Sequence, residues 1–143
     1  MASGTHVTPR QRIEAECSRR GQDAVVDDCI ALLKGSTDLS RLRSLAAAGA
    51  QKYADGKEHD DIYWFRVWAI RGLLWAWDPR ATDCVREAFS DEAWRVRELA
   101  AKVVARHLVG DAHAEVAARR DDPIPRVRAA AERAVVRLTA AGA

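Results

Sequence analysis

The residues of this chain whose types and spacing could do chemistry are tryptophans and basic residues in long helical stretches. Arg95, Lys102 and Arg106 fall on one face of a helix at about 100° per residue. Arginine pairs with carboxylates or phosphates, and tryptophan supplies large contact areas. This pattern therefore indicates recognition of a partner rather than bond making. A shift of 31 residues gives the equivalent stripes in the next and the preceding segment, which are Arg126, Arg133 and Arg137 in the next and Trp64, Arg71 and Trp75 in the preceding one, with Trp68 beside them.

Residue types that catalysis or metal binding would need are present but poorly spaced. The four histidines show no helical spacing for a metal, and no serine–histidine–aspartate or cysteine–histidine order is visible. Asp60 is better explained as a helix cap, and Asp61 as a first-turn charge that complements the helix dipole. Cys17, Cys29 and Cys84 form no close pair and suit small core positions. We therefore expect no catalytic residue, no bound metal and no cofactor.

Length and composition indicate a soluble, folded chain. Its 143 residues suit one domain, with 31% charged and 48% hydrophobic residues. No apolar run approaches the roughly 18 residues of a membrane helix, and residues 1–7 lack the apolar core of a signal peptide. We expect a cytoplasmic protein in which residues 1–7 are disordered and residues 8–143 form a single domain. The abundance of arginine and alanine favours a GC-rich bacterial genome.

The helices that must position these side chains follow a repeat of 31 residues. It relates Asp60, Asp91 and Asp122, then Arg66, Arg97 and Arg128, then Ala69, Ala100 and Ala131, then Arg71, Lys102 and Arg133. A period in this range is typical of stacked helical arrays. Strand signals are absent, so we predict an all-α fold, an α-solenoid of stacked antiparallel helix pairs. Capping and glycine signals place about eight helices, over residues 9–21, 23–35, 38–56, 60–77, 79–89, 91–108, 110–119 and 122–139.

Two of the repeated segments resemble the second helix of HEAT-like repeats. The shared pattern is an aspartate followed by Val96-Arg97 or Val127-Arg128, with Phe65-Arg66 as a bulkier match. The resemblance covers residues 60–140, whereas residues 9–56 fit only as degenerate helix pairs. It implies that the second helices line a concave groove. It also implies a structural ladder between neighbouring repeats, made by Asp60, Arg66, Asp91, Arg97, Asp122 and Arg128.

Two functions remain open from the sequence. The first is a non-enzymatic interaction module whose groove binds a partner protein or peptide, possibly acidic. The alternative is nucleic-acid binding by the basic concave face, remotely like HEAT-like alkylpurine DNA glycosylases, although a net charge of +2 is low for a DNA-binding protein. It also remains open whether the tryptophans line a groove or belong to the core. Either function would use the expected groove, formed by Trp64, Trp68, Arg71, Trp75, Arg95, Lys102, Arg106, Arg126 and Arg133.

Overall fold

The computed structural model describes residues 6–142 and is helical throughout. Within these residues there are eight α-helices, four 3-10 segments and no β-strand. The prediction of an all-α chain is therefore confirmed. Of the segment expected to be disordered, residues 1–5 lie outside the described residues, and Val7 is exposed just before the first helix.

The N-terminal third contains three α-helices and a long 3-10 segment. They are α1 (Pro9–Arg20), α2 (Gln22–Leu33), α3 (Leu39–Ala46) and η1 (Ala47–Asp55). Thr8 starts α1 with a capping box, in which its hydroxyl accepts from the Gln11 amide and the Gln11 side chain accepts from the Thr8 amide. The sequence predicts the start of α1 because Thr8-Pro9 combines an N-cap residue with a proline at the first helical position.

The segment predicted as one helix over residues 38–56 instead changes from α to 3-10 geometry at Ala47. Gly49 lies in the 3-10 part, and a Cβ atom there would stand 3.1 Å from Cζ2 of Trp68. The glycine thus lets the segment lie directly against an indole ring. Gly56 ends it in the left-handed conformation, with a φ of 73°. The sequence pattern does not distinguish the two helix types, because both place apolar residues at i and i+3.

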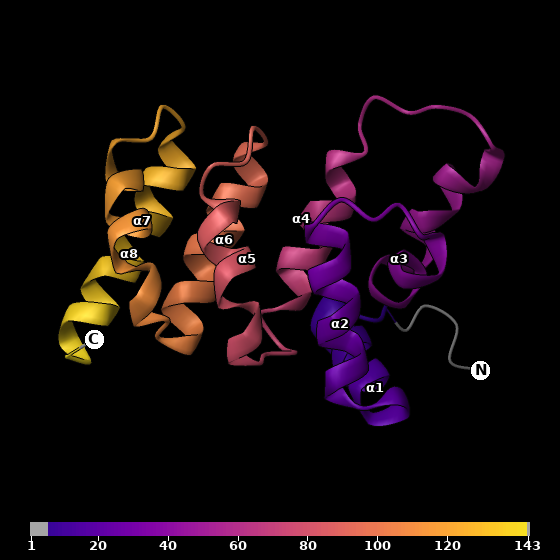
Figure 1. The fold of residues 1–143 in the computed structure, drawn as a ribbon, viewed down its shortest axis with the longest axis horizontal. Helices are drawn as coiled ribbons and strands as arrows, with labels where there is room; N and C mark the ends of the chain where they lie inside the picture. The colour runs from indigo at the N-terminus through magenta and orange to yellow at the C-terminus, as the bar shows by residue number, and fades with distance from the viewer. Residues whose placement is uncertain (1–5, 143) are drawn as a thin grey trace.

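The remaining helices follow in order along the longest axis of the molecule toward the C-terminus (Figure 1). In the repeated region, each long helix follows a turn that begins with an aspartate. Helix α6 packs against both α4 and α8, and α7 also packs against α8. These elements are α4 (Tyr63–Gly72), η2 (Pro79–Ala81), α5 (Thr82–Ala88), α6 (Trp94–His107), η3 (Gly110–Ala112), α7 (His113–Ala118), η4 (Arg119–Asp121) and α8 (Pro125–Ala140).

Helix α4 ends at Gly72 rather than at the predicted Trp77. The chain then turns tightly, and the ring of Trp77 stacks on His107 of α6 with centroids 4.8 Å apart. Nε2 of His107 lies 2.8 Å from the carbonyl oxygen of Leu73, which can only accept, so this nitrogen donates. The contact satisfies a carbonyl at the end of α4. Tertiary contacts with α6 therefore set the end of α4, and the local sequence pattern could not show them.

The sequence pattern suggested that the repeated aspartates cap the long helices, but they do not. Helices α6 and α8 start at Trp94 and Pro125, and their N-cap residues make no side-chain cap hydrogen bond. Asp91 and Asp122 stand further upstream, and each accepts a hydrogen bond, 2.9 Å long, from the amide two residues later. An aspartate with this bond closes an Asx turn. The aspartates therefore shape the turn that leads into each helix.

The core is continuous along α2, α4, α6 and α8 and is made of small and branched apolar residues. Val96, Ala100, Val103 and Val104 of α6 are all fully buried. Gly72 is buried at the crossing of α4 and α2, where a Cβ atom would stand 2.9 Å from Sγ of Cys29. This crossing is therefore too close for any larger residue.

We predict that Gly72→Ala destabilises the protein by about 1–3 kcal/mol through overpacking, despite the better helix propensity of alanine. Urea unfolding followed by circular dichroism measures the change. Cys29→Ala removes the opposing sulfur, so Gly72→Ala should cost less in that background. Equal costs in both backgrounds would show that the Cys29 contact does not limit the crossing.

Candidate binding surface

A row of neighbouring aromatic rings and guanidinium groups crosses the first turns of α4, α6 and α8, and Trp68 extends it into the second turn of α4. Cζ of Arg95 lies 4.5 Å from the ring centroid of Trp94 and 5.2 Å from that of Trp64. Cζ of Arg126 lies 5.2 Å from the Trp94 ring, and Trp64 and Trp68 have centroids 5.7 Å apart. These distances are within the range of cation–π and aromatic pairs. We call Trp68, Trp64, Arg95, Trp94 and Arg126 the Trp–Arg row.

The row forms because three of its members occupy the same position in successive helices. Trp64, Arg95 and Arg126 are 31 residues apart and lie in the first turn of α4, α6 and α8. Helix α6 packs against both neighbours, so equivalent side chains on adjacent helices come within reach of each other. All three tryptophans of the row are half-buried. The expectation that the tryptophans are either free in a groove or wholly core is therefore replaced by an intermediate arrangement.

A buried carboxylate extends the row into the next turn of α6. Glu98 is only 6% exposed, and its carboxylate accepts a hydrogen bond from Nε of Arg126 at 2.9 Å. Nζ of Lys102 approaches the same carboxylate at 3.8 Å. A buried charge needs such partners, because an unpaired one would be strongly destabilising. Glu98 thus joins Arg126 and Lys102 on one surface.

The other residues expected in the groove make no described contact with the row. Arg71 is half-buried, and burial lowers the pKa of its guanidinium. Arg133 and Arg106 are exposed, and Trp75 is half-buried against the core. Arg71 and Arg133 each follow a row member by seven residues, which is about two helical turns. They therefore continue the same helix faces toward the C-terminal ends of α4 and α8.

The structure joins the repeated arginines and aspartates in two inter-repeat pairs. Nε and Nη2 of Arg66 donate to Asp91 at 2.6 and 3.1 Å, and the same atoms of Arg97 donate to Asp122 at 2.8 and 3.1 Å. Both pairs are bidentate and join residues 25 positions apart. The second pair is the more buried, with side-chain exposures of 10% for Arg97 and 0% for Asp122.

Among residues 6–142, the two remaining ladder residues, Asp60 and Arg128, form no such pair. Gly35 stands 25 residues before Asp60 and offers no side chain to its carboxylate. Nη1 of Arg128 donates to the Asp122 carbonyl at 2.8 Å, as Nη1 of Arg97 does to that of Asp91. Arg128 therefore keeps the contact within its own repeat but has no described inter-repeat carboxylate.

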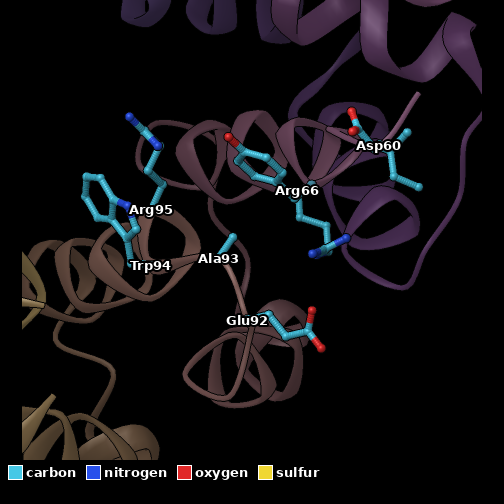
Figure 2. Close-up of a pocket in the computed structure, with 8 residues that line it drawn as sticks. Asp60, Arg66, Glu92, Ala93, Trp94 and Arg95 are labelled. Carbon is cyan, nitrogen blue, oxygen red and sulfur yellow. The ribbon is translucent and has the colours of Figure 1, made fainter. Parts of the chain in front are cut away.

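A surface pocket of about 420 Å³ lies between the starts of α4 and α6. Figure 2 shows Trp94 and Arg95 at one side of it and Asp60 and Glu92 at the other. Arg66 also lines the pocket, so cationic, anionic and aromatic groups meet there. The pocket adjoins the Trp–Arg row and gives that surface a concave part.

Two residues of this surface escaped the sequence analysis. The Trp94 ring contacts both Arg95 and Arg126, although the residues expected in the groove did not include it. Its position directly before Arg95, at the start of a helix, was the available signal. Glu98 was missed because alanine occupies its position in the next repeat, at Ala129. Repeat comparison favours shared residues and overlooks one that a single repeat uses.

No protein-family model, no curated protein and no solved structure matches the chain. Within residues 6–142, no group of three or more histidine, cysteine, aspartate or glutamate side chains is placed to hold a metal ion. None of the described helices is both long enough and apolar enough to span a bilayer.

The Arg97–Asp122 pair makes stability depend on pH in acid. Burial raises the pKa of Asp122, but hydrogen bonds from Arg97, the Ile124 amide and Arg119 outweigh it and hold the pKa below its usual value. An aspartate in the unfolded chain has a pKa of about 3.9. The stabilisation is therefore complete above that pH and is lost as the pH falls through the lower pKa of the folded state.

We predict that Asp122→Asn destabilises the protein at neutral pH by about 3–5 kcal/mol, because Arg97 would be left buried and unpaired. The difference between wild type and variant should shrink below about pH 4. Urea unfolding at several pH values measures this, with the exposed neighbour Asp121→Asn as the matched control. A difference that stays constant with pH would contradict the assignment of the acid response to Asp122.

Proposed function

We propose that this protein is a non-enzymatic interaction module, an α-solenoid of HEAT-like repeats that binds an acidic partner protein or peptide. The solenoid part of the proposal is supported by the 31-residue period, the serial packing of α4, α6 and α8, and the two equivalent arginine–aspartate pairs. Arrays of this kind present extended surfaces made of equivalent side chains. The binding surface would be the Trp–Arg row together with the basic residues that continue its helix faces.

The single observation that carries the proposal is the continuity of the row over three helices. Half-buried tryptophans combine a rigid anchor with exposed ring area, and such residues dominate the binding energy of many interfaces. The basic residues around them outnumber the one carboxylate that contacts them, Glu98. This excess favours a partner that brings carboxylates. Glu98 would limit the attraction and tune it to a partner of moderate charge.

Nucleic acid is the second candidate, because stacked aromatic rings and arginines also suit bases and phosphates. The net charge of +2 provides little long-range attraction for a phosphate backbone. Salt dependence separates the two candidates. Each phosphate contact with duplex DNA adds about 0.9 to the slope of log affinity against log salt, whereas a tryptophan-anchored peptide gives a shallow slope.

We predict that the double variant Lys102→Glu with Arg133→Glu weakens binding of a fluorescein-labelled, glutamate-rich helical peptide at least tenfold, since it replaces attraction by repulsion. Fluorescence anisotropy at 50 and 200 mM salt measures the peptide affinity. A labelled 20-base-pair DNA duplex is titrated in parallel. Lys57→Glu, an exposed lysine away from the row, is the control. Equal binding by the double variant and wild type would refute the proposed surface, and tight duplex binding with a steep salt slope would favour nucleic acid.

We further predict that Trp94→Ala weakens the same peptide by about 2 kcal/mol while Arg95 and Arg126 keep their charges. Loss of the ring removes the surface on which both guanidinium groups are stacked. Thermal unfolding of the variant checks that the fold persists. If Trp94→Ala lowers the melting temperature without any change in peptide affinity, the row only stabilises the packing of the helices and does not bind the peptide.

A further inference from the structure

A second pocket, of about 220 Å³, lies on the other side of Trp64 and Trp68, between η1 and α4. Its lining comes from two segments that the repeat does not relate. Gly49, Lys52 and Tyr53 lie in η1, and Asp61 precedes α4. Most of the wall is carbon, and the one carboxylate is that of Asp61.

The aromatic rings form walls at different angles. Tyr53 and Trp68 have centroids 6.3 Å apart and an interplanar angle of 76°, whereas Trp64 and Trp68 are tilted by 34°. Gly49 packs against the Trp68 ring, because a Cβ atom there would stand 3.1 Å from Cζ2. Three aromatic rings therefore line this small volume. Proteins build the cages that hold organic ammonium groups from such rings.

The carboxylate of Asp61 adds the complementary charge. One of its oxygens, Oδ2, pairs with the ammonium group of Lys52, and this hydrogen bond lowers the pKa of Asp61. The other oxygen, Oδ1, is buried and has no hydrogen-bond partner among the described residues. A cation in the pocket would be attracted by the charge of this carboxylate, although a fully alkylated ammonium group has no N–H to donate to Oδ1.

Lys52 shows that the pocket tolerates a positive charge. Its Nζ lies 5.4 Å from the centroid of the Tyr53 ring, while its side chain remains 55% exposed. A lysine on a flexible, exposed stem can swing into solvent and exchange its place with a ligand. The chain's own ammonium group is thus a displaceable occupant.

We propose that this pocket binds an organic ammonium group, with Lys52 as the internal competitor. Alkylated ammonium fits best, since its methyl groups contact aromatic walls and need no hydrogen-bond acceptor. A guanidinium group would leave most of its donors without acceptors. An inorganic cation would need several oxygen ligands, whereas the pocket offers one carboxylate. The proposal is independent of the acidic partner, although the two surfaces share Trp64 and Trp68.

The test compares choline with its neutral isostere 3,3-dimethylbutanol on the full chain, at matched ionic strength. The indole N–H signals of Trp64 and Trp68, observed by NMR, report binding. We expect choline to shift them saturably and the neutral alcohol to bind at least tenfold more weakly, because only the cation gains from the π faces and from Asp61. Similar binding of both compounds, or no saturable shift with choline, overturns the proposal.

Two variants test the roles of the charged residues without removing a ring. Asp61→Asn should weaken choline about tenfold, and Lys52→Ala should tighten it about tenfold by removing the competitor. Lys57→Ala, which removes a nearby exposed lysine, should change nothing. Unchanged or weaker binding by Lys52→Ala overturns the competitor role. Lys102→Glu with Arg133→Glu should leave choline binding intact, and Asp61→Asn should leave the acidic peptide intact, so the two proposals fail separately.

The ammonium group can come from a small molecule or from a methylated lysine of a protein. A short peptide containing trimethyl-lysine, titrated beside choline, distinguishes these sources. Tighter binding of the peptide assigns the pocket to a protein ligand. Equal affinity assigns it to the free compound.

Discussion

The surface described above depends on one buried interaction, the pair between Arg97 and Asp122. Arg97 holds the carboxylate of the turn before α8 and also donates to the carbonyl oxygens of Asp91 and Glu92, at 2.8 and 3.1 Å, in the turn before its own helix. One guanidinium group therefore fixes two consecutive turns relative to each other. Because a buried arginine must satisfy its donors, the two turns have little freedom to shift. Because these turns lead directly into α6 and α8, the first turns of the two helices are aligned as well. This alignment brings Arg126 to the ring of Trp94.

Small residues provide the second condition, since stacked side chains touch only where helices approach closely. Ala100 and Ala101 of α6 and Ala130 and Ala131 of α8 are all buried, and α6 and α8 form the most extensive helix contact in the described chain. Alanine at these positions brings the helix axes together. At the position equivalent to Ala101, α8 carries the exposed Glu132. This position of α8 therefore makes no close helix contact in the described structure.

These constraints explain how much the sequence could predict. The 31-residue period indicates helices and places Arg66 and Arg97 where the structure pairs them with aspartates. Helix ends were less accurate, because Asp91 closes a turn instead of capping α6 and because His107 helps to end α4. The common stripe of tryptophan and basic residues followed from angular spacing alone. The contacts between the arginines and the rings could not be predicted in this way, because they depend on the distance between the helices.

The 31-residue repeat could not predict the pocket that Tyr53 and Asp61 line. Its two segments share no period, and the decisive feature is the change of η1 to 3-10 geometry at Ala47, which has no distinct sequence signature. Gly49 falls inside the helix predicted over residues 38–56, and the pattern could not show that this is the point where the segment meets Trp68. Sites built by one irregular segment against one regular helix are therefore found from contacts, not from sequence pattern.

The arginines of the Trp–Arg row can contact the tryptophan rings and still bind a partner. A guanidinium group that lies over an indole uses its π face, while its N–H groups point outward in the plane and remain able to donate. Arg126 uses Nε for Glu98, and its side chain is still 65% exposed. Arg95 is held over two rings, so it loses less rotamer freedom when it pairs with a carboxylate than a free side chain would. The same contacts that hold the helices in register would thus preorganise the arginines for an acidic partner.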